Sequence, residues 1–233
     1  MKKLAIIPAR GGSKRIPQKN INPFLGKPII AYSIIAAQES GLFDEVMVST
    51  DDVQIAGIAE QYGAVVPFMR SASTSGDHAA TVDVLIEVLD DYQKIGKAFD
   101  YACCIYPTAP FVTAKMLREA YDLLLQKDFL SVFPVMQYSY PIWRSLKIDS
   151  GRLTMNYPEH EKSRSQDLPP AYHDAGQFYI FKTEELIAER TLFTSNSGAV
   201  VISEIEGQDI DCQSDWELAE MKYKLLKEQH GKF

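Results

Sequence analysis

The stretch LAIIPARGGSKRIPQKN, residues Leu4–Asn20, decides the fold of this 233-residue chain. Its apolar first half predicts a buried strand, which runs directly into two adjacent glycines and several cations. A strand that ends in this way brings backbone N–H groups and positive charge to a polyanion, most often a phosphate chain. Arg10 stands at the carboxyl end of the strand, where open α/β sheets bind ligands. The stretch therefore predicts a nucleotide site at the edge of an α/β sheet.

Two common phosphate-binding loops do not match this stretch. Gly11 and Gly12 are adjacent, with no third glycine at the offset that the dinucleotide fingerprint requires. The P-loop requires Gly-Lys-Ser/Thr, but Gly26 and Lys27 are followed by Pro28. A dehydrogenase and a Walker-type NTPase are therefore both disfavoured. The alternative interpretation is that the glycine pair makes a surface turn among solvated charges.

Composition and charge narrow the class of protein. With 46% hydrophobic and 24% charged residues, the chain can bury one sizeable core, so we expect a single domain over residues 1–233. A net charge of −7 argues against a nucleic-acid partner. No apolar run has the length of a membrane span and no signal peptide is recognisable, so we expect a cytoplasmic protein without a membrane partner. Cys103, Cys104 and Cys212 lack disulfide or metal-site spacing and are expected to be buried small hydrophobic residues.

The order of apolar runs predicts an α/β fold. Six β-branched runs are expected to be strands: Leu4–Pro8, Glu45–Ser49, Tyr101–Tyr106, Ser131–Val135, Gln177–Phe181 and Ala199–Ile202. Helical spacing lies between them, for example at Val82, Leu85, Ile86, Leu89 and Tyr92, and again near the end at Trp216, Ala219, Tyr223 and Leu226. Such alternation predicts a Rossmann-like three-layer sandwich with a mostly parallel sheet. We expect the last helix to pack on that sheet.

One segment, residues 136–172, breaks the alternation. It is rich in aromatic residues and prolines, and Asp149–Arg152 reads as a turn between two short strands. A long surface loop is one interpretation. Exposed aromatic side chains at this density more often mark a contact surface, so the segment predicts a binding surface for another molecule.

A metal site is suggested by Asp209 and Asp211. Two aspartates at i and i+2 of an extended segment project from the same face, so both carboxylates can reach one Mg²⁺ ion. Taken alone, this spacing is found more often in ordinary polar loops. Asp215 is open to two interpretations, because it can join the metal site or cap the final helix.

Separated segments of the chain together resemble the signature of the acylneuraminate cytidylyltransferases. They follow in the family's order, at Ile7–Asn20, Leu25–Pro28, Val48–Asp52, Tyr106–Pro110 and Asp209–Asp211, with Asp215 and Trp216 after them. Those enzymes activate nine-carbon acidic sugars as CMP-sugars. The resemblance implies a nucleotidyltransferase fold of type A, CTP and a nonulosonic acid as substrates, and Mg²⁺ as cofactor. It also implies a homodimer, in which residues 136–172 form an inserted arm that reaches the partner's sugar site.

The resemblance assigns roles to individual residues. Arg10, Lys19 and Asp211 are expected to be catalytic, with Asp209 and Asp211 as metal ligands. The implied nucleotide-binding residues are Arg10, Gly11, Gly12, Ser13, Lys19, Asn20, Arg70, Gly76 and Asp77, and the segments Phe68–Ser71 and Thr74–His78 are expected to close on cytosine. The implied sugar-binding residues are Tyr106, Arg164, His173 and Gln177, with Arg164 pairing with the sugar carboxylate. Lys14 and Arg15 fit the phosphate site or solvent equally well.

Two departures from the sialic-acid pattern concern the sugar. Tyr106 stands where those enzymes have glutamine, and His173 stands where they have arginine. The segments around these residues, Cys103–Pro110 and Tyr172–Tyr179, resemble those of the pseudaminic acid cytidylyltransferases. We therefore expect pseudaminic acid as the substrate. A structural role for His173 stays open. The alternative functions are a sialic acid cytidylyltransferase, a sugar-nucleotide pyrophosphorylase and a nucleotide-binding protein without turnover.

Overall fold

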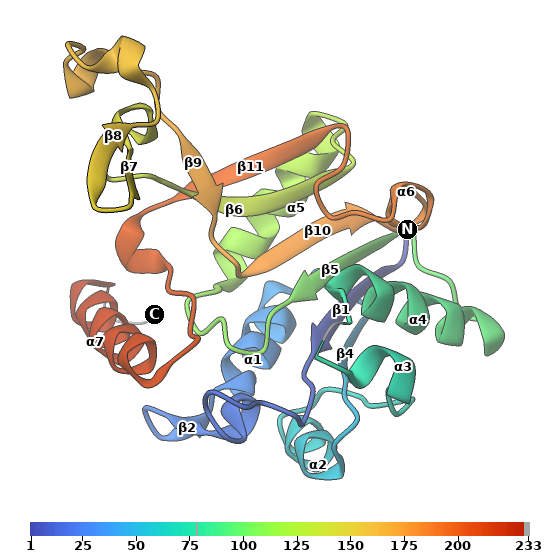
Figure 1. The fold of residues 1–233 in the computed structure, drawn as a ribbon. Helices are drawn as coiled ribbons and strands as arrows, with labels where there is room; N and C mark the ends of the chain where they lie inside the picture. The colour runs from blue at the N-terminus through green and yellow to red at the C-terminus, as the bar shows by residue number, and fades with distance from the viewer. Residues whose placement is uncertain (78, 231–233) are drawn as a thin grey trace.

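The computed structural model describes residues 1–77 and 79–230, which are arranged around one mixed sheet (Figure 1). The strands are β1 (Lys3–Pro8), β4 (Glu45–Ser49), β5 (Tyr101–Ile105), β6 (Ser131–Gln137), β10 (Phe178–Lys182) and β11 (Ser197–Ile202), and β9 (Tyr172–Asp174) pairs with β6. The order is β11-β6-β10-β5-β1-β4. β1 runs parallel to both neighbours and β6 runs parallel to β11, whereas β10 is antiparallel to β5 and β6. The six predicted strands and the mostly parallel sheet are confirmed.

Helices cover both faces of the sheet. On one face lie α1 (Ile30–Ser40), α2 (Val53–Gln61) and α5 (Ala114–Gln126), and on the other lie α4 (Thr81–Lys94) and α6 (Thr183–Glu189). Strand β1 explains why both faces are covered. Ala5 and Ile7 pack into the core on the side of α1, α2 and α5, while Leu4 and Ile6 pack into the core on the side of α4 and α6. Successive side chains of a strand point to opposite faces, so an unbroken apolar strand needs cover on both. The predicted three-layer sandwich is confirmed.

The three cysteines do not behave alike. Cys103 and Cys104 are fully buried on opposite faces of β5, as expected. The expectation of a buried Cys212 is wrong, because this residue is exposed just before the helix α7 (Gln213–His230) begins. Within the described part of the chain, no helix is long and apolar enough to cross a membrane.

Helix α7 does not pack on the central sheet, so that expectation is wrong. Its buried side chains, including Trp216, instead meet Phe24 of the small hairpin formed by β2 (Pro23–Phe24) and β3 (Lys27–Pro28). The rings of Phe24 and Trp216 lie 5.6 Å apart in an edge-on arrangement. Both faces of the sheet already have helical cover, so the helix uses its predicted apolar stripe on this separate cluster.

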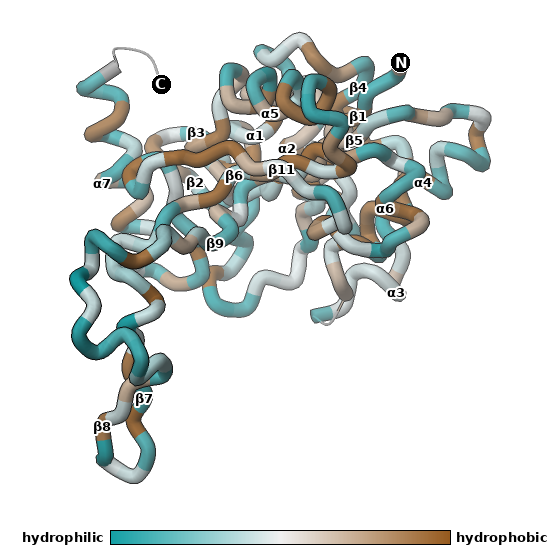
Figure 2. The backbone as a smooth tube through the Cα atoms, turned by 90° about the horizontal axis from the view of Figure 1, so that it is seen from above, coloured by the Kyte–Doolittle hydropathy of each residue, from teal (hydrophilic) through white to brown (hydrophobic). Residues whose placement is uncertain are grey.

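Residues between β6 and β9 form an arm that extends away from the body of the molecule (Figure 2). The arm contains the hairpin of β7 (Leu146–Asp149) and β8 (Arg152–Met155), as well as 3₁₀ turns at Ile142–Arg144, Pro158–His160 and Ser165–Asp167. Ser150 and Gly151 have φ of 49° and 79°, the geometry that a two-residue hairpin turn favours. The predicted turn is therefore confirmed. Its strands expose Leu146, Ile148 and Leu153, so the arm has little core of its own.

Candidate active site

A cleft of about 330 Å³ opens at the carboxyl ends of β1, β4 and β5. Its walls come from the loop after β1, from residues 70–81, from the loop after β5 and from Asp209. Seven of the predicted nucleotide-binding residues line it: Arg10, Ser13, Lys19, Asn20, Arg70, Gly76 and Asp77. Open α/β sheets bind ligands at this edge. The fold thus brings together residues that lie up to about two hundred positions apart.

Hydrogen bonds to other groups of the same chain hold the loop after β1 in place. The Gly11 N–H donates to the Asp51 carboxylate at 2.8 Å, and the Asn20 side-chain amide donates to the Arg10 carbonyl at 2.9 Å. A Cβ on Gly11 would lie 2.8 Å from the Asp52 carboxylate, so this position needs glycine. The Ser13 N–H donates back to Gly11 at 3.0 Å. These backbone donors must exchange protein acceptors for phosphate oxygens if they are to bind a triphosphate.

Gly12 differs from its neighbour. A Cβ built there meets no atom within 4 Å, so nothing that the structure describes demands glycine at this position. A small residue at the open mouth of the loop leaves space for a ligand to approach the backbone.

The Asp77 carboxylate forms ion pairs with two cations of the loop after β1, Arg10 and Lys14. It lies 2.7 Å from the Arg10 guanidinium and also accepts from the Lys14 ammonium. Hydrogen bonds from Lys14 and then Arg10 hold the pKa of Asp77 below its ordinary value, so the group is anionic at neutral pH. The sequence placed Asp77 among nucleotide-binding residues, but here its carboxylate stands where a phosphate would contact Arg10. Arg10, which the sequence assigns to the phosphate chain, is thus paired with Asp77 in this structure.

Lys19 joins the loop to the two aspartates. Its ammonium donates to the Ile210 carbonyl at 2.6 Å and lies 3.8 Å from the Asp211 carboxylate. Arg15 makes a closer ion pair with Asp211, at 2.7 Å. Burial lowers the pKa of Lys19, against the opposing effect of the two carboxylates. Lys14 and Arg15, which the sequence left open, thus both pair with acidic residues around the cleft.

Asp209 and Asp211 fit a divalent cation by their chemistry. Loss of solvent and the neighbouring Asp211 raise the pKa of Asp209, and a bound cation would relieve both effects. Carboxylate oxygens are the donors that Mg²⁺ prefers. No group of three or more His, Cys, Asp or Glu side chains suited to a metal occurs among the described residues.

Asp215 belongs to the start of the last helix. Its carboxylate accepts the N–H groups of Asp211 and Cys212 at 2.9 and 2.8 Å. These bonds satisfy backbone donors that a helix start leaves unpaired. Of the two interpretations from sequence, the structure shows the cap.

The other wall of the cleft is tied to β4 and α4. The Arg70 guanidinium donates to the Ser49 carbonyl at 2.6 Å and to its hydroxyl at 3.1 Å, and burial lowers the pKa of Arg70. Glu87 of α4 accepts the Ser71 N–H at 2.8 Å and the Thr74 hydroxyl at 2.5 Å. Sequence reasoning missed Glu87, since only helical spacing was visible there. His78, in the segment predicted to close on cytosine, lies outside the described residues.

Of the predicted sugar-binding residues, Tyr106 alone lines the cleft as the structure describes it. Its ring meets Tyr179 edge-on at 5.7 Å, and its hydroxyl lies 3.4 Å from the Thr81 hydroxyl. Tyr179 in turn donates a hydrogen bond to Asp174. Sequence reasoning gave no separate role to Thr81, Asp174 or Tyr179. Asp174 ends β9 and Tyr179 lies in β10, within the stretch Tyr172–Tyr179 that resembles the pseudaminic acid cytidylyltransferases.

The remaining predicted sugar residues lie away from this cleft. His173 packs its ring on Tyr138 at 4.8 Å and bonds the Asp174 carbonyl at 2.9 Å. Gln177 is buried, and its side-chain amide donates to the Glu206 carbonyl at 2.6 Å while its Oε1 accepts nothing from the described residues. Arg164 lies on the arm, where Asp167 binds its guanidinium. The structure therefore does not bring these three residues to the cleft of their own chain.

A cation-rich loop that faces aspartates across the open edge of a mostly parallel sheet defines the class of nucleotidyltransferases. Within that class, the chain belongs to the cytidylyltransferase family, because the sequence profile described as Cytidylyltransferase matches residues 4–198. The family and the enzyme class expected from sequence are both confirmed.

Named relatives agree with this assignment. The chain is 42% identical to "Pseudaminic acid cytidylyltransferase" of Campylobacter jejuni subsp. jejuni serotype O:23/36 (strain 81-176), across 98% of this chain and 99% of the relative. It is 34% identical to "N-acylneuraminate cytidylyltransferase A" of Danio rerio, across 94% of this chain and 50% of that protein. A solved CMP:2-keto-3-deoxy-manno-octonic acid synthetase complexed with CTP has a TM-score of 0.71 at 17% identity, covering 98% of this chain and 100% of its own, which supports the fold.

Proposed function

We propose that this protein transfers CMP from CTP to pseudaminic acid and releases pyrophosphate. The anomeric hydroxyl oxygen of the sugar bonds to the α-phosphorus of CTP. The bond from that phosphorus to the bridging oxygen breaks, pyrophosphate leaves with the electron pair, and the hydroxyl proton is lost. The observation that carries the proposal is the cleft itself, in which Arg10 and Lys19 face Asp209 at the carboxyl edge of the sheet.

In this proposal the loop after β1 binds the triphosphate. Arg10 and Lys19 contact its oxygens, with Lys19 next to the phosphoryl group that reacts, and Asp77 gives up Arg10 as the nucleotide enters. Gly11, Gly12, Ser13 and Asn20 shape the loop, while Arg70 and the backbone near Gly76 face the base. Rate acceleration then comes mainly from positioning and from positive charge at the transferring group.

Mg²⁺ is the proposed cofactor, held by Asp209 and Asp211. When bound, it supplies charge neutralisation at the transferring phosphoryl group. Arg15 and Lys19 hold the Asp211 carboxylate beside the loop, and the ion would take over contacts that Asp211 now makes with these cations.

We further propose a homodimer of single-domain chains, residues 1–233, in which residues 136–172 are the inserted arm. Leu146, Ile148 and Leu153 expose apolar surface on this arm, and Arg164 points to no group of its own cleft. A second copy would cover the apolar surface and receive Arg164 at the sugar end of its cleft. A cytoplasmic location is proposed as well, because CTP is supplied there and the cysteines are free thiols.

The choice of sugar rests first on Tyr106, which lines the cleft, and the sequence adds His173, which lies away from it. A site built for one pattern of polar groups rejects another by leaving buried polar atoms unpaired. Pseudaminic acid carries a second acylamino group and a terminal methyl, which suit the tyrosine ring better than they suit a glutamine. The greater identity to the pseudaminic acid enzyme, 42% against 34%, favours the same substrate. N-acetylneuraminic acid is the alternative.

The test compares kcat/KM for pseudaminic acid and N-acetylneuraminic acid under identical CTP and Mg²⁺, with pyrophosphate release as the readout. We expect a strong preference for pseudaminic acid, and Tyr106→Gln should narrow it. Equal values, or a preference for N-acetylneuraminic acid, would reject the proposed sugar. Absence of pyrophosphate with either sugar would favour the nucleotide-binding protein without turnover.

A further inference from the structure

The segment that carries the two aspartates has little regular structure to hold it. We call residues 204–211 the acidic segment. It begins with a 3₁₀ turn at Glu204–Glu206, and residues 207–212 belong to neither a helix nor a strand. A segment without ladder hydrogen bonds has to satisfy its backbone groups elsewhere, and its position depends on those partners. The place of Asp209 in the cleft therefore depends on side chains outside the segment.

Lys222 of α7 supplies three of these hydrogen bonds from one ammonium group. Its Nζ lies 2.9 Å from the Glu204 carbonyl, 2.8 Å from the Gly207 carbonyl and 3.1 Å from Oε1 of Gln208. A lysine ammonium has three N–H donors, so all three are used on this segment. Bonds from a charged donor are the stronger kind of hydrogen bond.

Through its hydrogen bond to Gln208, Lys222 is connected to the backbone of Asp209. While Oε1 of Gln208 accepts from Lys222, its Nε2 donates to the Asp209 carbonyl at 3.0 Å. The same side chain thus joins the ammonium to the main chain of the aspartate that lines the cleft.

The rest of the surroundings leaves the segment little freedom to take another path. Gln177 bonds the Glu206 carbonyl at 2.6 Å. A Cβ on Gly207 would lie 2.8 Å from the Met136 sulfur, so the chain passes close to β6 at this point. Lys222 of α7 adds its hydrogen bonds to the Glu204 and Gly207 carbonyls and to the Gln208 side chain.

We infer that Lys222 is a positioning residue that fixes the acidic segment and so sets the place of Asp209 in the cleft. Lys222 does not line the cleft and acts through the Glu204 and Gly207 carbonyls and the Gln208 side chain. The consequence for catalysis rests on the proposed function, whereas the consequence for the segment does not.

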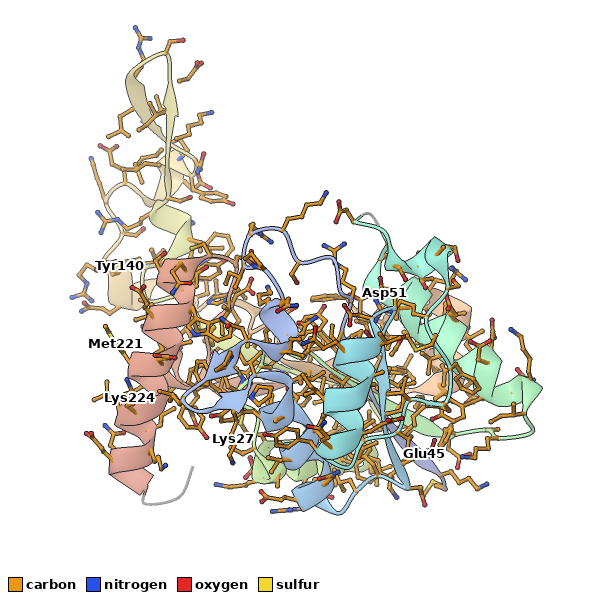
Figure 3. All side chains as sticks on the ribbon, turned by 90° about the horizontal axis from the view of Figure 1, so that it is seen from below. Lys27, Glu45, Asp51, Tyr140, Met221 and Lys224 are labelled. Atoms are coloured by element: carbon orange, nitrogen blue, oxygen red, sulfur yellow. The ribbon has the colours of Figure 1, made fainter. Side chains whose placement is uncertain are left out.

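The experiment compares Lys222→Met with Lys224→Met, a matched control on the same helix whose side chain is exposed (Figure 3). Amide hydrogen exchange of peptides covering residues 203–212 is measured on the full-length protein without nucleotide. We expect faster exchange of these peptides in Lys222→Met alone, with other peptides unchanged. Lys222→Arg, which keeps a charged donor, should return exchange toward the wild-type rate. If Lys222→Met does not fold, Gln208→Leu tests the same connection to Asp209.

Kinetics on the same proteins provide the second readout. In Lys222→Met we expect kcat to fall about tenfold with little change in the KM for CTP, since misplacement of a catalytic group acts on the reacting step. Equal exchange in Lys222→Met and Lys224→Met overturns the inference, as does a uniform rise across the whole chain or local exchange with unchanged kcat. A wild-type protein that does not convert CTP refutes the proposed function, and the exchange comparison still decides the role of Lys222.

Discussion

The nucleotide end of the cleft and the arm are built on opposite principles. In the cleft, Asn20 is 5% exposed and the Lys19 side chain 20%, and each has a partner in the same chain. On the arm, Ile148 is 74% exposed and the Arg164 side chain 71%. A single chain therefore completes the charged half of the site but leaves the half predicted to bind sugar open. In the proposed homodimer, a second copy of the chain would supply what is missing.

The largest effect is expected at Asp209, the aspartate that lines the cleft. Asp209→Asn removes an oxygen anion from the proposed metal site, so kcat should fall about a thousandfold. Folded-state surroundings raise the pKa of Asp209, so its charge disfavours folding at neutral pH, and that cost disappears as the pH falls through the raised pKa. The variant should therefore show a higher Tm than wild type at pH 7 in metal-free buffer.

Steady-state pyrophosphate release and thermal unfolding check the two halves of this prediction. Asp122→Asn is the control, because Asp122 is exposed on α5 and does not line the cleft. Near-normal turnover in a folded Asp209→Asn protein would refute the assignment of Asp209 as a metal ligand. A lowered Tm would contradict the prediction that the charge of Asp209 destabilises the fold.

The cations of the loop should give the next largest effect. Lys19→Ala and Arg10→Ala are each expected to lower kcat/KM for CTP about a hundredfold, because charge on a transferring phosphoryl group is felt mainly in the transition state. Lys147→Ala, on the arm, should change it little. Normal kcat/KM in both loop variants would show that the loop is only a structural turn. The comparison between the nucleotide end of the cleft and the arm would then lose its basis.

Mixing two inactive variants tests directly whether the arm serves a second copy. Arg164→Ala alone should lower kcat/KM for the sugar about thirtyfold, as expected for a lost bidentate contact to a carboxylate. In a mixed dimer with Lys19→Ala, one of the two sites would hold both intact residues. Equal mixtures that have exchanged subunits should therefore recover about a quarter of the wild-type rate, by random pairing of the two chains. Absence of recovery would contradict the proposed placement of Arg164 in the partner's site.

The smallest expected effect concerns stability of the arm. Ile148→Lys places a charge on an exposed apolar surface, so the free energy of unfolding should change by no more than about 0.5 kcal/mol. Sedimentation velocity should nevertheless show a shift from dimer to monomer. Ile187→Lys on α6, also exposed, is the control and should leave the oligomer unchanged. If the dimer persists in Ile148→Lys, the dimer interface does not include the β7–β8 hairpin.

Local pattern was enough for much of the fold and for the charged loop. The run Leu4–Asn20 predicted β1 and the cations at its end, and Asp149–Arg152 predicted a hairpin turn that the structure confirms. These features depend on residues a few positions apart: an unbroken apolar run in β1, and two consecutive positive φ angles at Ser150 and Gly151. Short-range sterics and burial therefore decide them before the chain is folded.

Contacts between distant segments could not be obtained in this way. Arg10 meets Asp77 across 67 positions, and Lys222 meets Glu204 only because α7 packs on the hairpin at Phe24 instead of on the sheet. The sequence by itself determined which elements form and which residues carry charge to the cleft edge. Tertiary structure alone decided which partners those charges meet, because docking of helices and loops is set by the summed packing of many residues and by no local motif.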